Sequence, residues 1–383
     1  MSSYYLVGAR VVLANDVLND ASVLIEDDKI VAIDPVSSGR AQEISLKGQV
    51  LIPGVIDLHC DALEKEVEPR PNVRFPTDFA VAQADRRNAS AGITTIFHAI
   101  SFANEELGVR NNDFAASVAR AVHQWNTHAL IDNRVHCRYE VTDPTAPALL
   151  LELMDADQMH LLSVMDHSPG QGQFKDLAAF RDYLSRTYKH SEAELDALVE
   201  KKIAQGNGAM ERIRLLIDAA KRKGIRIASH DDDTAEKVTT LHEMGVGISE
   251  FPINLAAASA AHSRGMSTIF GAPNILRGKS QSGSMRALDA IVAGVADCLC
   301  ADYHPAALLS SVFRLPQLTD ISLPAAVRLV SSNPAHAAGL EDRGEISVGK
   351  RADLVSVVEL NGLAQASRVF SNGRPVFEAH FHG

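Results

Sequence analysis

Cysteine is scarce in this sequence of 383 residues: there are four, Cys60, Cys137, Cys298 and Cys300, and no two of them form a CxxC pair. The count is low for the length, so a disulfide framework is not expected and a reducing cytoplasm is the simpler interpretation. The first residues lack a charged stretch leading into an apolar one, so no signal peptide is predicted. No apolar run is long enough to cross a bilayer, which argues against a membrane partner.

An excess of positive charge is also missing. The chain has 37 Lys and Arg against 48 Asp and Glu, a net charge of -11, so a nucleic-acid partner is not expected. A small anionic substrate stays open, because local cations and metals decide its binding rather than the sum of charges. The sequence shows no internal repeat, and nothing in it bears on subunit contacts, so a homo-oligomer is left open.

Both ends of the chain read as short β-strands with Gly and Asp turns. This pattern covers residues 1–50 and returns at 344–383, which predicts a small β-sandwich domain formed from the two ends. Residues 51–343 differ, because apolar strands alternate there with helical patterns such as 211–224 and 284–297.

The middle of the chain holds eight candidate strands, the number that closes a parallel (β/α)8 TIM barrel. They are 54–58, 92–98, 135–141, 160–166, 225–229, 247–251, 267–271 and 297–301. An open doubly wound sheet is the competing α/β architecture, but it predicts ligands at one switch point only. Here polar or charged residues follow nearly every strand, so we expect the barrel.

The first of these strands runs into DLHCD, in which His59 and Asp61 stand two residues apart. Side chains two apart on a strand point the same way, so this imidazole and carboxylate project together at the carboxyl end of the strand. Such a pair forms half of a site for a divalent metal. Alone the signal is weak, because HxD is a common chance pattern.

The signal strengthens because His167, His230 and Asp302 also end predicted strands, and Glu140 ends another. A single histidine at a strand end is usually structural. Three histidines and two aspartates on four strands, with a carboxylate on a fifth, are improbable without a metal at the catalytic face of a barrel.

The roles follow from charge. One or two divalent cations are expected, and zinc, manganese and iron all suit these ligands. If there are two, Glu140 is the expected bridge, since no lysine ends any of the strands. A metal lowers the pKa of a bound water, and Asp302 is the candidate general base that takes its proton.

Several other polar residues have structural interpretations. His98 has apolar neighbours and is expected in the core, and His136 is expected to support the ligands at most. Asp233 is expected to cap the helix that follows, while Asp231 could orient His230 or a metal.

The longest connection, about 168–224, contains Ser191 and Glu194 in the spacing of a capping box. A lid and a plain helical insertion fit it equally.

Residues on the catalytic side indicate an anionic substrate. Stretch 274–284 follows the seventh strand and combines Arg, Lys, Ser and Gly before a helix, which suits phosphate, although the Walker A spacing is absent and a flexible loop is the alternative. The candidate substrate-binding residues are Lys65, Arg70, Asn274, Arg277, Lys279, Ser280, Ser282 and Tyr303.

The stretches PGVIDLHCD and GEISVGKRADLV resemble the amidohydrolase superfamily. More specific stretches, SVMDHSPGQGQF and GAPNILRGKSQSG, are similar to a branch of it that hydrolyses a ribosyl phosphonate triphosphate in the bacterial carbon–phosphorus lyase pathway. The resemblance implies release of pyrophosphate, leaving a 5-phosphate on the ribosyl phosphonate.

Two other functions remain as alternatives. One is hydrolysis of a C–N bond by a cyclic amidase, deacetylase or deaminase, which would leave Arg70, Arg277 and Lys279 without an evident task. The other is a non-enzymatic barrel that serves in a complex, which degenerate ligands would favour, whereas here the ligands are intact.

Overall fold

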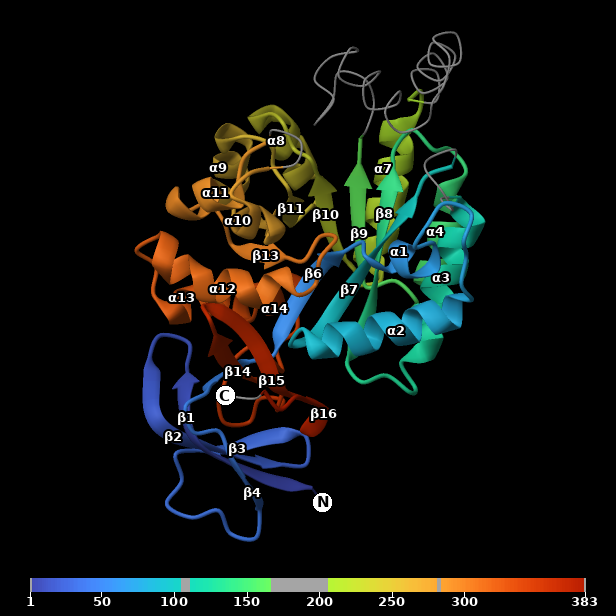
Figure 1. The fold of residues 1–383 in the computed structure, drawn as a ribbon. Helices are drawn as coiled ribbons and strands as arrows, with labels where there is room; N and C mark the ends of the chain where they lie inside the picture. The colour runs from blue at the N-terminus through green and yellow to red at the C-terminus, as the bar shows by residue number, and fades with distance from the viewer. Residues whose placement is uncertain (1, 105–110, 167–205, 281–283, 382–383) are drawn as a thin grey trace.

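The computed structural model describes residues 2–104, 111–166, 206–280 and 284–381. Two sheets organise these residues, and Figure 1 shows them one above the other, with both chain termini in the lower sheet. Within the described part of the chain, no helix has the length and apolar character needed to traverse a membrane.

The upper sheet has eight parallel strands in sequential order, as expected for a (β/α)8 barrel. A parallel bridge between Cys60 and Asp302 brings the first strand against the last. The strands are β6 (Val55–Cys60), β7 (Ile93–Phe102), β8 (Asp132–Glu140), β9 (Leu161–Met165), β10 (Arg226–His230), β11 (Ile248–Glu250), β12 (Ser267–Gly271) and β13 (Cys298–Cys300). All eight lie where the sequence predicts strands.

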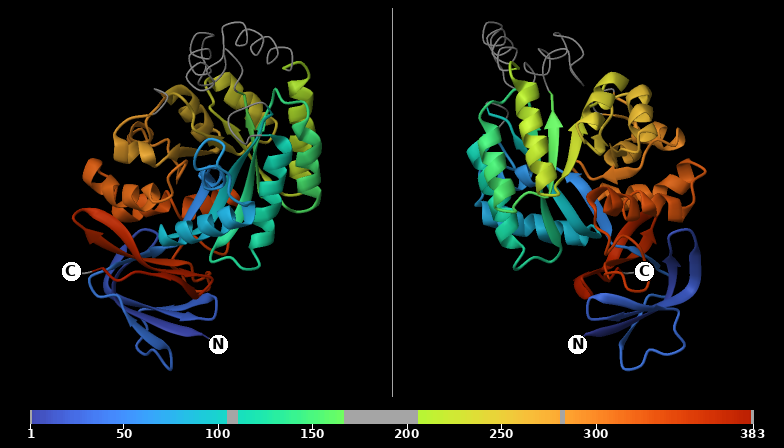
Figure 2. Two further views of the ribbon diagram at one scale, coloured as in Figure 1. Left: turned by 45° about the vertical axis from the view of Figure 1, so that its right-hand side comes forward. Right: turned by 180° about the vertical axis from the view of Figure 1, so that it is seen from behind.

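Helices surround this barrel in the views of Figures 1 and 2. Those described are α1 (Leu63–Val67), α2 (Thr77–Ser90), α3 (Asn112–Trp125), α4 (Ala146–Asp155), α7 (Ala209–Arg222), α8 (Ala235–Glu243), α9 (Leu255–Ser263), α10 (Pro273–Arg277), α11 (Ala287–Val292), α12 (Ala307–Leu318), α13 (Leu323–Arg328) and α14 (Ser332–Ala338).

One capping prediction is wrong. Helix α8 is capped by Thr234, whose hydroxyl accepts from the Lys237 amide at 3.1 Å, and not by Asp233. The predicted capping box of Ser191 and Glu194 lies outside the described residues.

The lower sheet is built from both chain ends. Its order is β16-β15-β14-β5-β1-β2-β3, and β4 pairs with β1. The strands are β1 (Ser3–Val12), β2 (Val17–Glu26), β3 (Lys29–Ile33), β4 (Gln42–Ser45), β5 (Val50–Pro53), β14 (Leu354–Leu360), β15 (Leu363–Ser371) and β16 (Arg374–Glu378). The antiparallel pair β5 and β14 joins the two ends of the chain.

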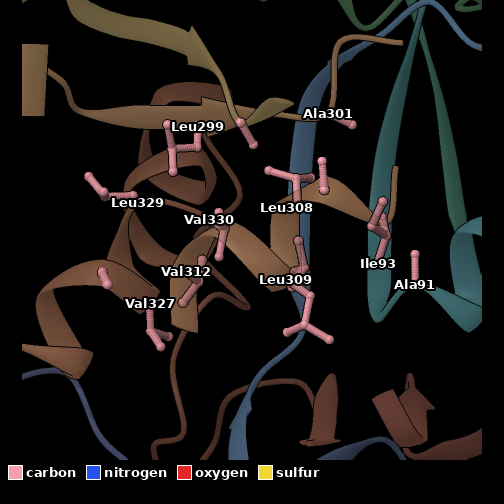
Figure 3. Close-up of a cluster of buried hydrophobic side chains, with 14 of the residues drawn as sticks. Ala91, Ile93, Leu299, Ala301, Leu308, Leu309, Val312, Val327, Leu329 and Val330 are labelled. Carbon is pink, nitrogen blue, oxygen red and sulfur yellow. The ribbon is translucent and has the colours of Figure 1, made fainter. Parts of the chain in front are cut away.

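The hydrophobic core lies mainly between the barrel strands and the surrounding helices. Figure 3 shows part of it, a cluster that includes Leu299 of β13, Leu308 and Val312 of α12, Val327 of α13 and Ile93 of β7. Fully burying each such side chain contributes about 1.5–3 kcal/mol, so this layer fixes the strands that carry the polar residues.

The barrel interior is apolar in its middle, and its two ends differ. At the amino end the buried guanidinium of Arg343 donates to Thr95 at 2.9 Å and to Asp132 at 2.7 Å. The arrowheads of β8, β9 and β10 in Figure 1 point away from the lower sheet, so the carboxyl ends of the barrel strands lie on the opposite side. In barrels of this kind that side holds the active site.

Candidate metal centre and active site

The predicted ligands of the first and eighth strands lie side by side where the barrel closes. The Asp302 amide donates to the His59 carbonyl at 2.9 Å, and the Asp61 amide donates to the Asp302 carbonyl at 2.9 Å. The side chain of Asp57 reinforces this seam, because it accepts from the His59 amide at 3.1 Å and from the Ala301 amide at 3.0 Å. Backbone bonds therefore fix the HxD pair relative to Asp302.

Three buried groups form a candidate metal-binding cluster. Donor atoms of His59, His230 and Glu250 all lie within 4.8 Å of one another. The two imidazole rings are 5.5 Å apart between centroids, and the Phe251 ring packs against both, at 4.9 and 5.2 Å. Two imidazoles and a carboxylate are donors that suit a divalent cation.

Glu250 was missed by the sequence reasoning. It is fully buried at the end of β11, where it is the ladder partner of His230 on β10. The available signal was the only charged residue in the strand GISEF, at a strand end of a barrel in which several other strand ends carry predicted ligands.

Glu250 sets the tautomer of His59. Its Oε1 lies 3.0 Å from His59 Nδ1, and its Oε2 accepts from the Ser163 hydroxyl at 2.9 Å. Burial lowers the pKa of His59 well below its ordinary value, so the ring is neutral. Because an ionised carboxylate only accepts, Nδ1 carries the hydrogen and Nε2 keeps the lone pair that a metal requires.

Two further histidines are placed as the sequence reasoning expected. His136 packs against His59 with ring centroids 5.1 Å apart, its Nδ1 lies 3.1 Å from the Leu58 carbonyl, and burial lowers its pKa to about 3. Its Nε2 lies 3.7 Å from Glu250 Oε2, so it lies one step from the cluster. His98 bonds through Nε2 to Asn133 Oδ1 at 2.9 Å and belongs to the core.

Asp302 has the environment of a proton acceptor. Burial and the neighbouring charge of Asp61 raise its pKa to about 7, against a partial lowering by Arg138. A carboxyl group with a pKa near neutrality can take and return a proton at working pH.

The backbone is strained at three strand ends around this site. Asp231, Phe251 and Asp302 have φ values of 53°, 53° and 55°, a left-handed region that side chains rarely adopt. Such conformations cost free energy and persist where surrounding contacts hold them, typically at functional sites. In this conformation Asp231 Oδ2 lies 3.4 Å from His230 Nδ1, which agrees with an orienting role for Asp231.

Of the two remaining predicted ligands, the structure describes Glu140 but not His167. Glu140 is buried at the end of β8, and the Thr142 hydroxyl donates to its Oε1 at 2.9 Å. Its role as a bridge stays a prediction. His167 lies outside the described residues, so its prediction as a ligand is untested.

The predicted substrate-binding residues lie around the same end of the barrel. The exposed Arg277 donates through Nη1 to the Tyr303 hydroxyl at 3.1 Å, so the segments after β12 and β13 meet next to Asp302. A Cβ added at Gly271 would be 3.5 Å from Asn274 Nδ2 and 3.6 Å from Asp302 Oδ2, which places both groups around this glycine.

The other candidate substrate residues that the structure describes lie outside the buried cluster of His59, His230 and Glu250. Lys65 lies in α1, and Arg70 lies in the turn that follows it; both are exposed. Lys279 and Ser280 follow α10, and Ser282 lies outside the described residues.

The first part of stretch 274–284 is a helix, and its role in phosphate binding stays a prediction. Residues 274–277 are helical and belong to α10, which runs from Pro273 to Arg277 and is followed by Gly278 with a φ of 70°. Arg277 therefore lies in the last turn of a short helix. Proline at the first position and glycine just past the end are helix signals that were readable in the sequence.

A match to a family model decides the family: the model described as the amidohydrolase family covers residues 78–364. The chain belongs to this family. Its members are metal-dependent, and His59, His230 and Glu250 could hold a divalent cation, so the chain is a metal-dependent hydrolase by family.

Individual relatives agree with this assignment. The chain is 34% identical to the alpha-D-ribose 1-methylphosphonate 5-triphosphate diphosphatase of Escherichia coli (strain K12) over 373 residues, 96% of this chain and 98% of that protein.

Two solved structures show the same fold at low identity. One is the N-acetylglucosamine-6-phosphate deacetylase of Pasteurella multocida, with a TM-score of 0.65, 16% identity and coverage of 97% and 98% of the two chains. The other is an Xaa-Pro dipeptidase, with a TM-score of 0.67, 15% identity and coverage of 99% and 100%.

Proposed function

We propose that the protein is a diphosphatase that hydrolyses alpha-D-ribose 1-methylphosphonate 5-triphosphate to the 5-phosphate and pyrophosphate, as a step in phosphonate breakdown. The observation that carries the proposal is the similarity to the Escherichia coli enzyme named for that substrate, which spans 96% of this chain. The exposed Arg277 at the carboxyl end of the barrel supports it, because it donates to the hydroxyl of Tyr303, the residue that follows Asp302.

The residues that would hold the metal are His59, Asp61, His230 and Asp302, with His167, and Glu140 would bridge a second cation. Glu250, the third member of the buried cluster, would support His59 through its contact with Nδ1. A divalent cation there would polarise a phosphoryl oxygen and lower the pKa of the attacking water. Zinc, manganese and iron all suit the donors.

Asp302 would handle the proton in the reaction. The water oxygen forms a bond to phosphorus, the bond from that phosphorus to a bridging oxygen breaks, and its electron pair leaves on that oxygen. Asp302 would take the proton from the water and return it to the products.

Binding of the triphosphate would fall to the residues at the rim. The Arg277 guanidinium offers paired donors for phosphate oxygens, and Tyr303 holds it in place. Asn274 lies near Asp302 and can donate an amide hydrogen to the same group. Lys65, Arg70 and Lys279 would add attraction from exposed positions, where salt screens it.

Phosphorus NMR of purified protein with the ribosyl phosphonate triphosphate and zinc, manganese or iron tests the proposal. Pyrophosphate and the 5-phosphate should appear in equal amounts, and water labelled with oxygen-18 identifies the phosphorus attacked. The variant His59→Asn should be inactive, whereas Arg277→Gln should mainly raise KM.

The opposing result is also clear. No pyrophosphate with any metal, together with turnover of a cyclic amide or an N-acetyl sugar, would overturn the proposal in favour of C–N hydrolysis.

A further inference from the structure

A buried guanidinium faces the barrel interior beside the candidate metal ligands. Arg138 lies on β8 between His136 and Glu140, and residues two apart on a strand share a face. Contact between His136 and Glu250 identifies that face as the interior. Arg138 is 7% exposed, and its Nη2 lies 3.8 Å from Asp61 Oδ2.

The donors of this arginine are largely unused. Among the described residues, Nε and Nη2 of Arg138 have no hydrogen-bond partner. Ser101 of β7 is the ladder partner of Arg138, and its buried hydroxyl also lacks a described partner. A cation and a hydroxyl left together without partners are costly in a protein interior, so they indicate a ligand that completes them.

Asp61 does not serve as that partner once a metal is bound. At 3.8 Å it is within ion-pair range of Arg138 but beyond hydrogen-bond length. As a metal ligand it would direct its charge to the cation instead. A buried guanidinium next to a metal then needs an anion from elsewhere, because an uncompensated buried charge is strongly unfavourable.

We propose that Arg138, assisted by Ser101, binds the non-bridging oxygens of the phosphoryl group that is hydrolysed. The proposal rests on the proposed function, because the ligand it requires is a phosphoryl anion. A guanidinium offers a planar pair of donors that matches two phosphoryl oxygens. Arg138 Nη2 lies 3.8 Å from the carboxylate of Asp61, whose amide donates to the Asp302 carbonyl, and this places Arg138 beside the candidate ligands.

This assignment also implies selectivity. A neutral amide gives a buried guanidinium no charge to pair with, whereas each phosphoryl group of a triphosphate does. Arg138 would thus favour phosphorus over C–N substrates on a barrel shared with deacetylases and peptidases.

Titration of the protein with inorganic pyrophosphate in the calorimeter, with and without zinc, tests the inference without relying on turnover. For Arg138→Gln, pyrophosphate affinity should fall at least tenfold. The kcat/KM for the ribosyl triphosphate should fall about a hundred- to a thousandfold, as for a lost donor to a developing oxyanion. Arg138→Lys should recover part of both, and Ser101→Ala should show a smaller loss. The matched control is Arg134→Lys, on the same face of β8 but at the amino end and paired with Asp132 at 3.0 Å, which should bind pyrophosphate normally.

Zinc affinity of the same variants, measured by chelator competition, separates this role from a structural one. Removing a cation beside the site should leave zinc affinity unchanged or higher. Weaker zinc binding with unchanged pyrophosphate binding would overturn the inference and make Arg138 a counter-ion of Asp61. Wild-type protein that fails to bind pyrophosphate would overturn it as well. If pyrophosphate binding depends on Arg138 but the ribosyl triphosphate is not cleaved, the inference stands and the proposed substrate fails.

Discussion

The contact between Glu250 and His59 predicts a specific metal-binding defect for Glu250→Gln. Both side chains are fully buried, and Oε1 stands 3.0 Å from Nδ1. The substitution keeps the shape of the side chain but removes the charge, so a charge-assisted hydrogen bond becomes a neutral one. Such a change costs roughly 1–1.5 kcal/mol. Loss of an outer partner of a metal-ligating histidine typically weakens metal binding about 10- to 100-fold.

The expected result is therefore a dissociation constant for zinc about 10 to 100 times higher, or about 1.4 to 2.8 kcal/mol, measured by competition with a chromogenic chelator at neutral pH. Ser163→Ala is the matched control. It removes the other described hydrogen bond of the Glu250 carboxylate and leaves the bond to His59 in place, so its effect should be less than threefold.

Two results would refute this reasoning in different ways. Unchanged zinc affinity would mean that Glu250 does not support His59. A loss far beyond a hundredfold would mean that Glu250 is itself a ligand, which the 4.8 Å spacing of the three donor groups also permits.

Three further predictions concern catalysis, pH dependence and packing. Asp302→Asn should lower kcat about 10²- to 10⁴-fold in a steady-state assay, and an unchanged kcat would remove it as the general base. Burial lowers the pKa of His160 to about 4, so the unfolded state binds more protons between pH 6.5 and 4, and stability falls as pH falls through that window. In urea titrations of metal-free protein, His160→Asn should abolish the part of this loss in unfolding free energy that His160 causes, on the order of 3 kcal/mol. An unchanged dependence of the unfolding free energy on pH would contradict this. Gly54→Ala would press a methyl group against Thr94 and should destabilise the protein by about 1–3 kcal/mol, whereas Gly247→Ala, with open space around it, should not; equal melting temperatures would contradict the packing argument.

The barrel was predictable because its signal is local. Each strand is a short apolar run bounded by helical patterns, and the polar residue that ends it marks the catalytic side. Parity along a strand was enough to expect His59 and Asp61 together, and the structure places Asp302 beside them.

The residues that were missed depend on contacts across the barrel. Glu250 reaches His59, which is 191 positions earlier in the chain, and no pattern within β11 indicates that partner. The position of Arg138 could be predicted from the sequence, because residues two apart on a strand share a face and Arg138 stands between His136 and Glu140. Its significance appears only once its donors are seen to lack described partners.

The contacts that close the barrel also position the ligands of the first and eighth strands. Asp57 accepts from Ala301, 244 positions away, and from His59, so the carboxylate that ties the last strand to the first also fixes the first ligand. Burial raises the pKa of Asp57 to about 7, which means that its charged form is costly there and that the bonds it makes offset only part of that cost. A chain that fails to bring these two strands together loses the backbone bonds between His59, Asp61 and Asp302 at the same time. The ligands from the first and eighth strands are thus positioned by closure itself, whereas Glu250 and Arg138 depend on side-chain packing within a barrel that is already closed.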